Sequence, residues 1–372
     1  MICMSKVKAF LKRKGVVLSL QRYGIDALAA MAQGLFCTLL VGTILNTVGQ
    51  QFGIEFLNRV IVTIGTGEGA VHYTVGGLAS ALVGPGIAVA IGAALQCPNL
   101  VLFSLIPVGF AANAMGGAGG PLAVFFVTIA AAECGKMVSK ETRVDILVTP
   151  IVTILVGVGV ASLIAAPIGN AAKSVGVAIM WATELHPFFM GIIVSVVIGM
   201  ALTLPISSAA ICAALTLTGL AGGAAVAGCC AQMVGFAVMS FRENRWGGLV
   251  AQGVGTSMLQ MPNIVRNPKI WIPPTLASAI TGPIATCLFH FQMNDPAGGV
   301  ASGMGTCGMV GPIGVYAGWV NDVATGAKEA ITGTDWLAMG LICILLPAVL
   351  TLLIGAVCRK LGWIREGDLK LD

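Results

Sequence analysis

The chain has 372 residues, of which 57% are hydrophobic and only 9% are charged, whereas about 25% of the residues of a soluble domain are charged. This composition excludes a soluble globular protein. The charges are also unevenly spread, because residues 69–132 and 185–241 contain no Asp, Glu, Lys or Arg. Apolar runs of about 18 or more residues can cross a bilayer as helices, so the sequence predicts an all-α polytopic membrane protein.

Glycine and cysteine usage refines this class. Glycine supplies 50 residues, and small residues let transmembrane helices pack closely and break beside cavities. The eleven cysteines form no CxxC pair and no Cys/His cluster, so we expect neither a metal site nor a cofactor. The net charge of +5 is concentrated near the N-terminus. It indicates membrane topology, and nothing else in the sequence favours nucleic-acid binding.

The N-terminal arm, residues 1–22, contains six basic side chains and no acidic one. On a helical wheel Lys6, Lys8, Lys12 and Arg13 share one face, which predicts an amphipathic helix on the anionic leaflet of the cytoplasmic membrane. A plain basic tail is the alternative. Both interpretations place the N-terminus in the cytoplasm.

The apolar runs predict about ten transmembrane helices. The predicted spans are 27–48, 70–93, 99–115, 120–137, 145–168, 187–203, 206–225, 226–241, 271–291 and 336–358. Segment 248–265 is broken by Gly, Gln and Pro and resembles a re-entrant hairpin, and the Gly-rich segment 297–320 is predicted to be discontinuous. The mixed-charge tail after Arg359 is expected in the cytoplasm, as is the loop 136–145, so both termini lie inside.

Polar residues inside apolar segments are candidates for function, since they are costly unless they are paired. Glu68 and His72 lie four residues apart in a Gly-rich stretch and would share a helical face; the alternative is an interfacial turn. His186 precedes Pro187 at a predicted helix start, where it could either bind a solute or act structurally. No catalytic residue is assigned, because the usual enzyme motifs are absent.

The densest polar cluster lies in the segment 252–269. Its members are Gln252, Thr256, Ser257, Gln260, Asn263, Arg266, Asn267 and Lys269. Uncharged donors and acceptors in a broken segment suit a neutral, hydroxyl-rich ligand, whereas the alternative is a loop at the membrane surface. The sequence therefore predicts a substrate site formed by His186, Thr256, Ser257, Gln260 and Asn263, with Glu68 and His72 as further candidates.

Residues 261–274 (MPNIVRNPKIWIPP) resemble the loop that ends in an LP-hydrophobic-NP-hydrophobic-P pattern in sugar-transporting enzyme IIC subunits of the bacterial phosphotransferase system, glucose superfamily. The stretches 186–187, 203–208, 10–15 and 303–306 are similar to a divergent IIC branch that includes perfringolysin-regulator-like membrane proteins. The resemblance extends over nearly the whole chain.

The resemblance implies about ten transmembrane helices, two re-entrant hairpins, a homodimer and an elevator-type movement. The implied divisions are the arm 1–22, a scaffold and dimerisation half 23–180, a transport half 181–358 and a cytoplasmic tail 359–372. The resemblance implies that His186 is the counterpart of a histidine that holds the sugar in the family. The family's glutamate has no counterpart, because Thr256 and Ser257 stand near its place.

The implied function is a permease of the cytoplasmic membrane for a small polar, sugar-like solute, with a separate IIB protein as a possible partner. The missing glutamate leaves two alternatives open. One is a membrane sensor that has lost phosphotransfer. The other is a proton-coupled transporter that uses Glu68 or Asp295 as its buried acid.

Overall fold

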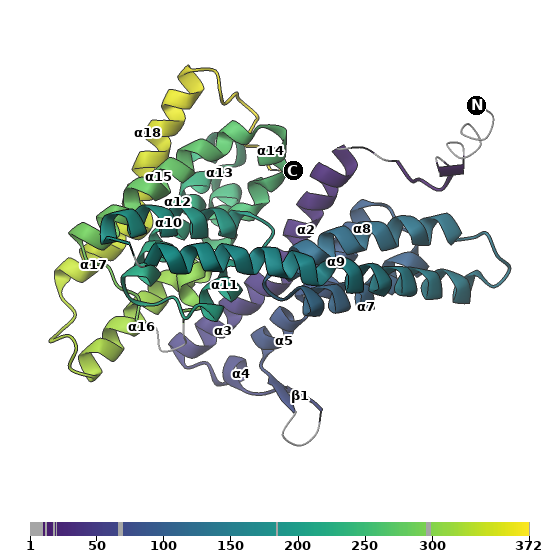
Figure 1. The fold of residues 1–372 in the computed structure, drawn as a ribbon, viewed down its shortest axis with the longest axis horizontal. Coiled ribbons are helices and arrows are strands. Elements are labelled where there is room, and N and C mark those ends of the chain that lie inside the picture. Colours follow the sequence, from purple (N-terminus) through teal and green to yellow (C-terminus); the bar gives the residue numbers. More distant parts are fainter. Residues whose placement is uncertain are drawn as a thin grey trace. The chain divides into compact units, whose positions relative to one another are not determined.

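The computed structural model describes residues 10–11, 13–17, 19, 21–65, 70–183, 185–294 and 299–371. The chain forms two compact units. Unit 1 comprises the residues up to Asn46 together with Glu55–Ala171, and unit 2 comprises Thr47–Ile54 and Ala172–Asp372. Figure 1 shows that both are built almost entirely of helices. Much of the arm lies outside the described residues, so its predicted amphipathic helix stays a prediction.

Unit 1 is a bundle of apolar helices. The helices that lie in it, wholly or in part, are α2 (Ala27–Leu35), α3 (Val41–Phe52), α4 (Glu55–Asn58), α5 (Val75–Ala81), α6 (Val83–Ala94), α7 (Asn99–Gly116), α8 (Gly120–Val138) and α9 (Asp145–Thr183). Helix α6 packs against α2, α7 and α8. Gly84 and Gly109 allow the contact with α7, because a Cβ atom on either would overlap the carbonyl of the other. Such small-residue contacts are common between membrane helices.

A two-stranded antiparallel sheet connects α4 and α5. Strand β1 (Val62–Ile64) pairs with β2 (Val71–Tyr73), and Thr63 lies opposite His72. The predicted span 70–93 therefore begins as a strand, and its helical part is the α5–α6 pair, bent by 56°. Thr74 caps α5 by accepting a hydrogen bond from Gly77 N at 3.0 Å.

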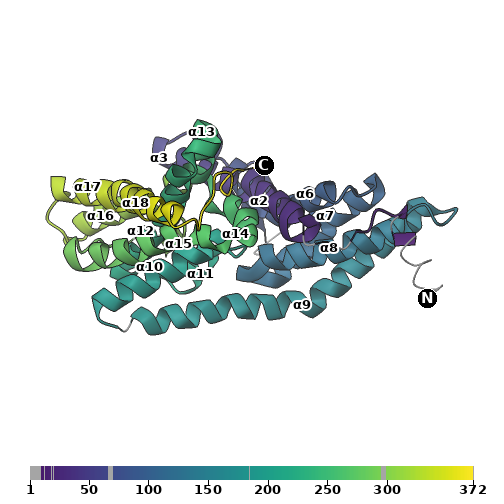
Figure 2. The ribbon, with the colours of Figure 1, turned by 90° about the horizontal axis from the view of Figure 1, so that it is seen from above.

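Unit 2 is built around one central helix, α12, which is buried along nearly all its length. Its larger helices are α10 (Pro187–Thr203), α12 (Gly219–Met239), α13 (Phe241–Val250), α15 (Ile272–Pro283), α16 (Val310–Ala324), α17 (Gly333–Gly340) and α18 (Leu346–Lys360). Helices α10, α15 and α18 pack against α12 (Figures 1 and 2). Gly228 makes the crossing with α10 possible, because a Cβ atom there would overlap the Ser195 carbonyl.

Short helical segments interrupt this bundle. They are α11 (Ser208–Ala214), η5 (Ala251–Gly255), η6 (Ser257–Gln260), α14 (Met261–Arg266), η7 (Pro268–Trp271), η8 (Ile284–Leu288), η9 (Ala301–Gly303), η10 (Cys307–Met309) and η11 (Leu341–Leu345). The segments around 248–265 and 297–320 are therefore broken helices, as the glycines and prolines predict. Helix α11 meets η9, where Ser208 Oγ donates a hydrogen bond to Gly303 O at 2.7 Å.

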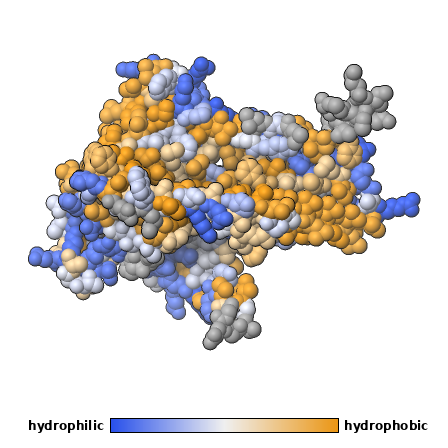
Figure 3. All heavy atoms as spheres, viewed as in Figure 1, coloured by the Kyte–Doolittle hydropathy of each residue, from blue (hydrophilic) through white to orange (hydrophobic). Residues whose placement is uncertain are grey.

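Five helical stretches among the described residues are long and apolar enough to cross a membrane, or six with the α5–α6 pair counted as one. One of them, Asn99–Val138, has 40 residues, about twice the length needed for a single crossing. It breaks at Gly117, and α7 and α8 pack side by side (Figure 2). Figure 3 shows hydrophobic residues over much of the visible face of the molecule. The protein is thus an all-α integral membrane protein, and the ten crossings stay a prediction.

Two predicted boundaries are wrong. The division between spans 206–225 and 226–241 falls instead at residues 215–218, where Thr216 and Gly219 adopt positive φ angles of 46° and 65° that end one helix and start the next. The expected loop 170–185 is mostly helical, because α9 continues to Thr183 through Pro150 and Pro167.

Candidate functional site

Two helix breaks bring polar side chains into the core of unit 2. Helix α10 ends at Thr203, and the backbone between η5 and η6 becomes extended at Thr256, with φ −157° and ψ 142°. Thr256 Oγ1 accepts a hydrogen bond from Met258 N at 3.1 Å, which starts the next helical turn. The break places the side chain of the following residue, Ser257, beside α10.

The core polar network consists of Thr203, Gln232, Ser257, Trp271 and Thr275. Thr203 Oγ1 lies 2.8 Å from Ser257 Oγ and 3.3 Å from Gln232 Oε1. Trp271 Nε1 donates to Gln232 Oε1 at 2.9 Å, and Gln232 Nε2 donates to Thr275 Oγ1 at 3.3 Å.

Burial and the absence of charge define what the core polar network can bind. Thr203, Gln232 and Ser257 are fully buried, whereas Trp271 and Thr275 are half-buried and extend the network to the surface of unit 2. Buried neutral groups are tolerated when they are hydrogen-bonded. A hydroxyl-rich solute could exchange its own donors and acceptors for those of the network, because each Ser and Thr hydroxyl can do both.

A second network joins the broken segment to the C-terminal tail. Gln260 Nε2 donates to Gln252 Oε1 at 2.8 Å and to Leu369 O at 3.0 Å. Asn263 Nδ2 donates to Gln260 Oε1 and to Lys370 O, both at 2.8 Å. The amide groups of Gln260 and Asn263 are thus engaged by the tail in this structure.

The other predicted site residues lie elsewhere. His186 is exposed and caps the start of α10, where its Nδ1 accepts from Phe188 N at 3.4 Å. Because α10 has 17 residues, it separates His186 from Thr203 by about 25 Å. His72 lies in unit 1, exposed, with its Nδ1 2.9 Å from Thr63 Oγ1. Glu68 is outside the described residues.

The structure therefore divides the predicted residues of the broken segment: Ser257 belongs to the core polar network, Gln260 and Asn263 belong to the network with the tail, and Thr256 caps η6. His186 and His72 lie away from both networks. Sequence reasoning missed Gln232, which joins three other members of the core polar network. A signal was present, since Gln232 is the sole Asn or Gln side chain between residues 185 and 241.

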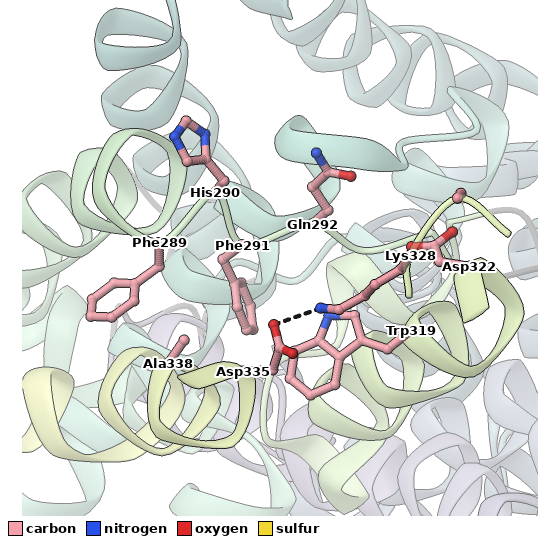
Figure 4. Close-up of a pocket in the computed structure, with 10 residues that line it drawn as sticks. Phe289, His290, Phe291, Gln292, Trp319, Asp322, Lys328, Asp335 and Ala338 are labelled. Atoms are coloured by element: carbon pink, nitrogen blue, oxygen red, sulfur yellow. Dashed lines mark hydrogen bonds and ion pairs between the residues drawn. The ribbon is translucent and has the colours of Figure 1, made fainter. Parts of the chain in front are cut away.

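Unit 2 also contains a cavity of about 300 Å³ with aromatic and polar walls (Figure 4). Figure 4 shows Phe289 and Phe291 directed to one side of their segment and His290 to the other. Lys328 Nζ forms an ion pair with Asp335 Oδ1 at 2.6 Å and lies 5.3 Å from the Trp319 ring centroid. The lining also includes Asp322, whose Oδ2 accepts a hydrogen bond from Asn294 Nδ2 at 2.8 Å, so the cavity suits a polar solute that can donate hydrogen bonds to a carboxylate.

No group of three or more His, Cys, Asp and Glu side chains in the described ranges is arranged to hold a metal ion. The candidate chemistry is thus hydrogen bonding to a polar solute. Apolar helices of spanning length around a buried, uncharged polar network define an integral membrane protein with a polar interior.

The family follows from a scan of known protein families. Residues 25–371 match the family described as the phosphotransferase system, EIIC, and the chain belongs to this family. It is accordingly a membrane permease for sugar-type substrates. No curated protein and no solved structure matched the chain. The narrower, perfringolysin-regulator-like branch stays a prediction.

Proposed function

We propose that the protein moves a small, hydroxyl-rich, sugar-like solute across the cytoplasmic membrane and that the core polar network holds this solute. The observation that supports the proposal is the convergence of the α10 end, α12 and the broken segment 251–271 on Thr203, Gln232 and Ser257. These groups are buried, uncharged and able to exchange hydrogen bonds with hydroxyls.

The division of the chain into two units supports an elevator-type mechanism. In this proposal the half 181–358 is the transport half, and the half 23–180 is a scaffold that forms a homodimer. The packing of α10, α15 and α18 around α12 would let the transport half move as one body, because close-packed cores resist internal deformation. Both termini, the arm and the tail 359–372, would face the cytoplasm.

Phosphorylation would require groups beyond the core polar network. A general base must lie within hydrogen-bond reach of the hydroxyl that it activates, and the network's hydrogen-bonded side chains contain no carboxylate. A separate IIB protein would have to supply the phosphoryl group. Transport therefore does not depend on phosphorylation in this proposal.

A sensor with the same fold is the second candidate. The observation that favours it is the attachment of the tail to Gln260 and Asn263, since a solute that altered the broken segment would also alter the tail. A proton-coupled transporter is the third, but its candidate acids, Glu68 and Asp295, lie outside the described residues.

The test is uptake of radiolabelled neutral hexoses and amino sugars into proteoliposomes without a phosphoryl donor. We expect the Ser257→Ala and Thr275→Val variants to lose uptake. The matched control is Thr281→Val, because Thr281, like Ser257, is fully buried but its hydroxyl donates only to carbonyls of its own helix, at 2.9 and 3.2 Å. Unchanged uptake in both network variants would refute the assignment of the site.

The same vesicles separate the three functions. If the protein is a pure sensor, vesicles that contain the wild type accumulate no solute. If it is a proton-coupled transporter, uptake stops when the proton gradient is dissipated. Uptake by the His186→Ala and Gln260→Ala variants tests the remaining predicted contacts, and normal uptake in both would remove those residues from the site.

A further inference from the structure

Unit 1 contains a cavity of about 400 Å³ beside the loop that connects α8 and α9. We call it the basic cavity. Its polar lining consists of Arg13, Lys14, Lys136, Ser139, Lys140 and Glu141. None of these residues belongs to the proposed transport site in unit 2, so the basic cavity requires its own explanation.

Lys136, which lines the basic cavity, forms a buried ion pair that sequence reasoning missed. Lys136 Nζ lies 2.7 Å from Glu133 Oε2, and the Lys136 side chain is only 2% exposed. The same ammonium donates to Gly15 O and Leu95 O, both at 3.3 Å. These three partners match the three N–H donors of the ammonium and fix its charge in one place, because a buried ammonium needs all its hydrogen bonds.

The rim of the basic cavity comes from the arm. Arg13 Nη2 lies 2.8 Å and Lys14 Nζ 2.5 Å from the same oxygen, Glu141 Oε1. Lys14 also donates to Ser139 O. One carboxylate therefore balances two cations, and a positive charge is left over at the rim.

The charge balance around the basic cavity is positive. The cations in and next to it are Arg13, Lys14, Arg22, Lys136 and Lys140, and the carboxylates are Glu133, Glu141 and Asp145. Asp145 is bonded through Oδ1 to the Lys140 backbone N–H at 2.7 Å, and the Lys140 side chain is exposed. A phosphate group fits such a surplus, since its oxygens accept several charge-assisted hydrogen bonds at once.

Exposed apolar side chains near the cavity residues in the chain favour a lipid as the source of the phosphate. The residues that follow the loop are strongly exposed apolar ones, with Ile146 71% and Leu147 61% exposed. Phe103, on the second turn of α7, is 61% exposed. A phosphate bound beside such side chains can belong to a lipid whose acyl chains cover them, whereas a soluble phosphate ester would leave them bare.

We propose that the basic cavity binds the phosphate of an anionic phospholipid headgroup. The bound lipid would hold the arm, through Arg13 and Lys14, against the end of α8. This role is independent of solute transport, because every residue of the basic cavity lies in unit 1 and the core polar network lies in unit 2.

The test uses the full-length protein, purified in detergent and stripped of lipid. Thermal unfolding is followed by far-ultraviolet circular dichroism, because all six tryptophans lie in unit 2, while phosphatidylglycerol, phosphatidylcholine or inorganic phosphate is added. We expect phosphatidylglycerol to raise the midpoint more than the other two. The Arg13→Gln/Lys140→Gln variant should bind phosphatidylglycerol about fivefold more weakly for each cation removed. Lys140→Arg, which keeps the positive charge, should bind it as tightly as the wild type.

The matched control is Lys360→Gln, which removes an exposed cation from unit 2 and should leave the response unchanged. Native mass spectrometry provides a second readout, since it counts retained lipids even if a variant is less stable. Equal responses to phosphatidylglycerol and phosphatidylcholine, or a double variant that responds like the wild type, would overturn the proposal. If inorganic phosphate raises the unfolding midpoint as much as phosphatidylglycerol does, the cavity binds a free anion and the lipid proposal is wrong.

Discussion

The tail should detach from the broken segment when Leu369 is truncated to alanine. Leu369 is fully buried, and its carbonyl accepts hydrogen bonds from Asn244 Nδ2 at 2.8 Å and Gln260 Nε2 at 3.0 Å. Leu→Ala at a buried position costs about 2–5 kcal/mol. Ordering the last few tail residues already costs about 1–2 kcal/mol each, so the substitution removes a large part of the apolar burial that offsets this cost.

Hydrogen exchange followed by mass spectrometry measures this detachment. A loss of 2–5 kcal/mol corresponds to an opening equilibrium shifted by roughly 30- to several-thousand-fold, so Leu369→Ala should exchange fast in the peptides that cover 363–371 and 256–267. The control is Leu361→Ala, because Leu361 is 57% exposed and should change exchange little. If Leu369→Ala exchanges like the wild type, the buried leucine does not hold the tail and our reasoning is wrong.

Three further predictions concern packing and ionisation. Gly223→Ala should abolish monodisperse protein in gel filtration, because its Cβ would overlap Phe291 O, whereas Gly159→Ala has open space and should behave normally. Burial raises the pKa of the Cys97 thiol to about 11, so its alkylation rate should keep rising above pH 9; a plateau there contradicts this. The hydrogen bond from Lys14 and the charge of Arg13 lower the pKa of Glu141. The ion pairs of ionised Glu141 therefore stabilise the bound arm fully above an ordinary Glu pKa of about 4.3, and this stabilisation is lost as pH falls through the lower pKa of Glu141 in the folded protein. Hydrogen exchange of residues 10–17, corrected for the pH dependence of the intrinsic exchange rate, should thus not change between pH 7 and 5.

The membrane class could be predicted because charge-free runs as long as 185–241 have no soluble interpretation. The helix boundaries inside the run 185–241 could not be predicted from the sequence. Helix α12 is buried on all sides, so it lacks the apolar and polar faces by which a helix is located in a sequence. The break at Thr216 depends on a backbone conformation, φ 46°, that no single residue type signals.

Only part of the candidate site could be predicted from the sequence. Thr256 and Ser257 stood out because they belong to a dense polar segment, whereas Gln232 is a lone amide in an apolar helix. The bonds from Gln260 and Asn263 to the tail join residues 109 and 107 positions apart. Local sequence patterns contain no information about partners so distant, and only the folded chain shows which amides are already engaged.

Glu243 is a buried carboxylate of unit 2 that could act in place of the glutamate missing from the family pattern, and its surroundings favour a structural role. Its side chain is 6% exposed. Oε1 accepts hydrogen bonds from Gly367 N at 3.2 Å and Arg359 Nη2 at 3.4 Å, whereas Oε2 is buried without a hydrogen-bond partner in the part of the chain that the structure describes. Glu243 is thus bonded to the tail and to α18.

Glu243→Gln separates the structural role from a catalytic one. Glutamine keeps an acceptor for Gly367 N but loses the charge that pairs with Arg359, so the tail should exchange faster in the variant. Uptake of solute without a phosphoryl donor should stay at the wild-type level, because the core polar network does not include Glu243. Loss of uptake with normal tail exchange would instead assign the carboxylate to transport. If a IIB protein and phosphoryl donor produce a phosphorylated sugar with the wild type but not with Glu243→Gln, and the tail remains bound, then this carboxylate is the base and the structural interpretation fails.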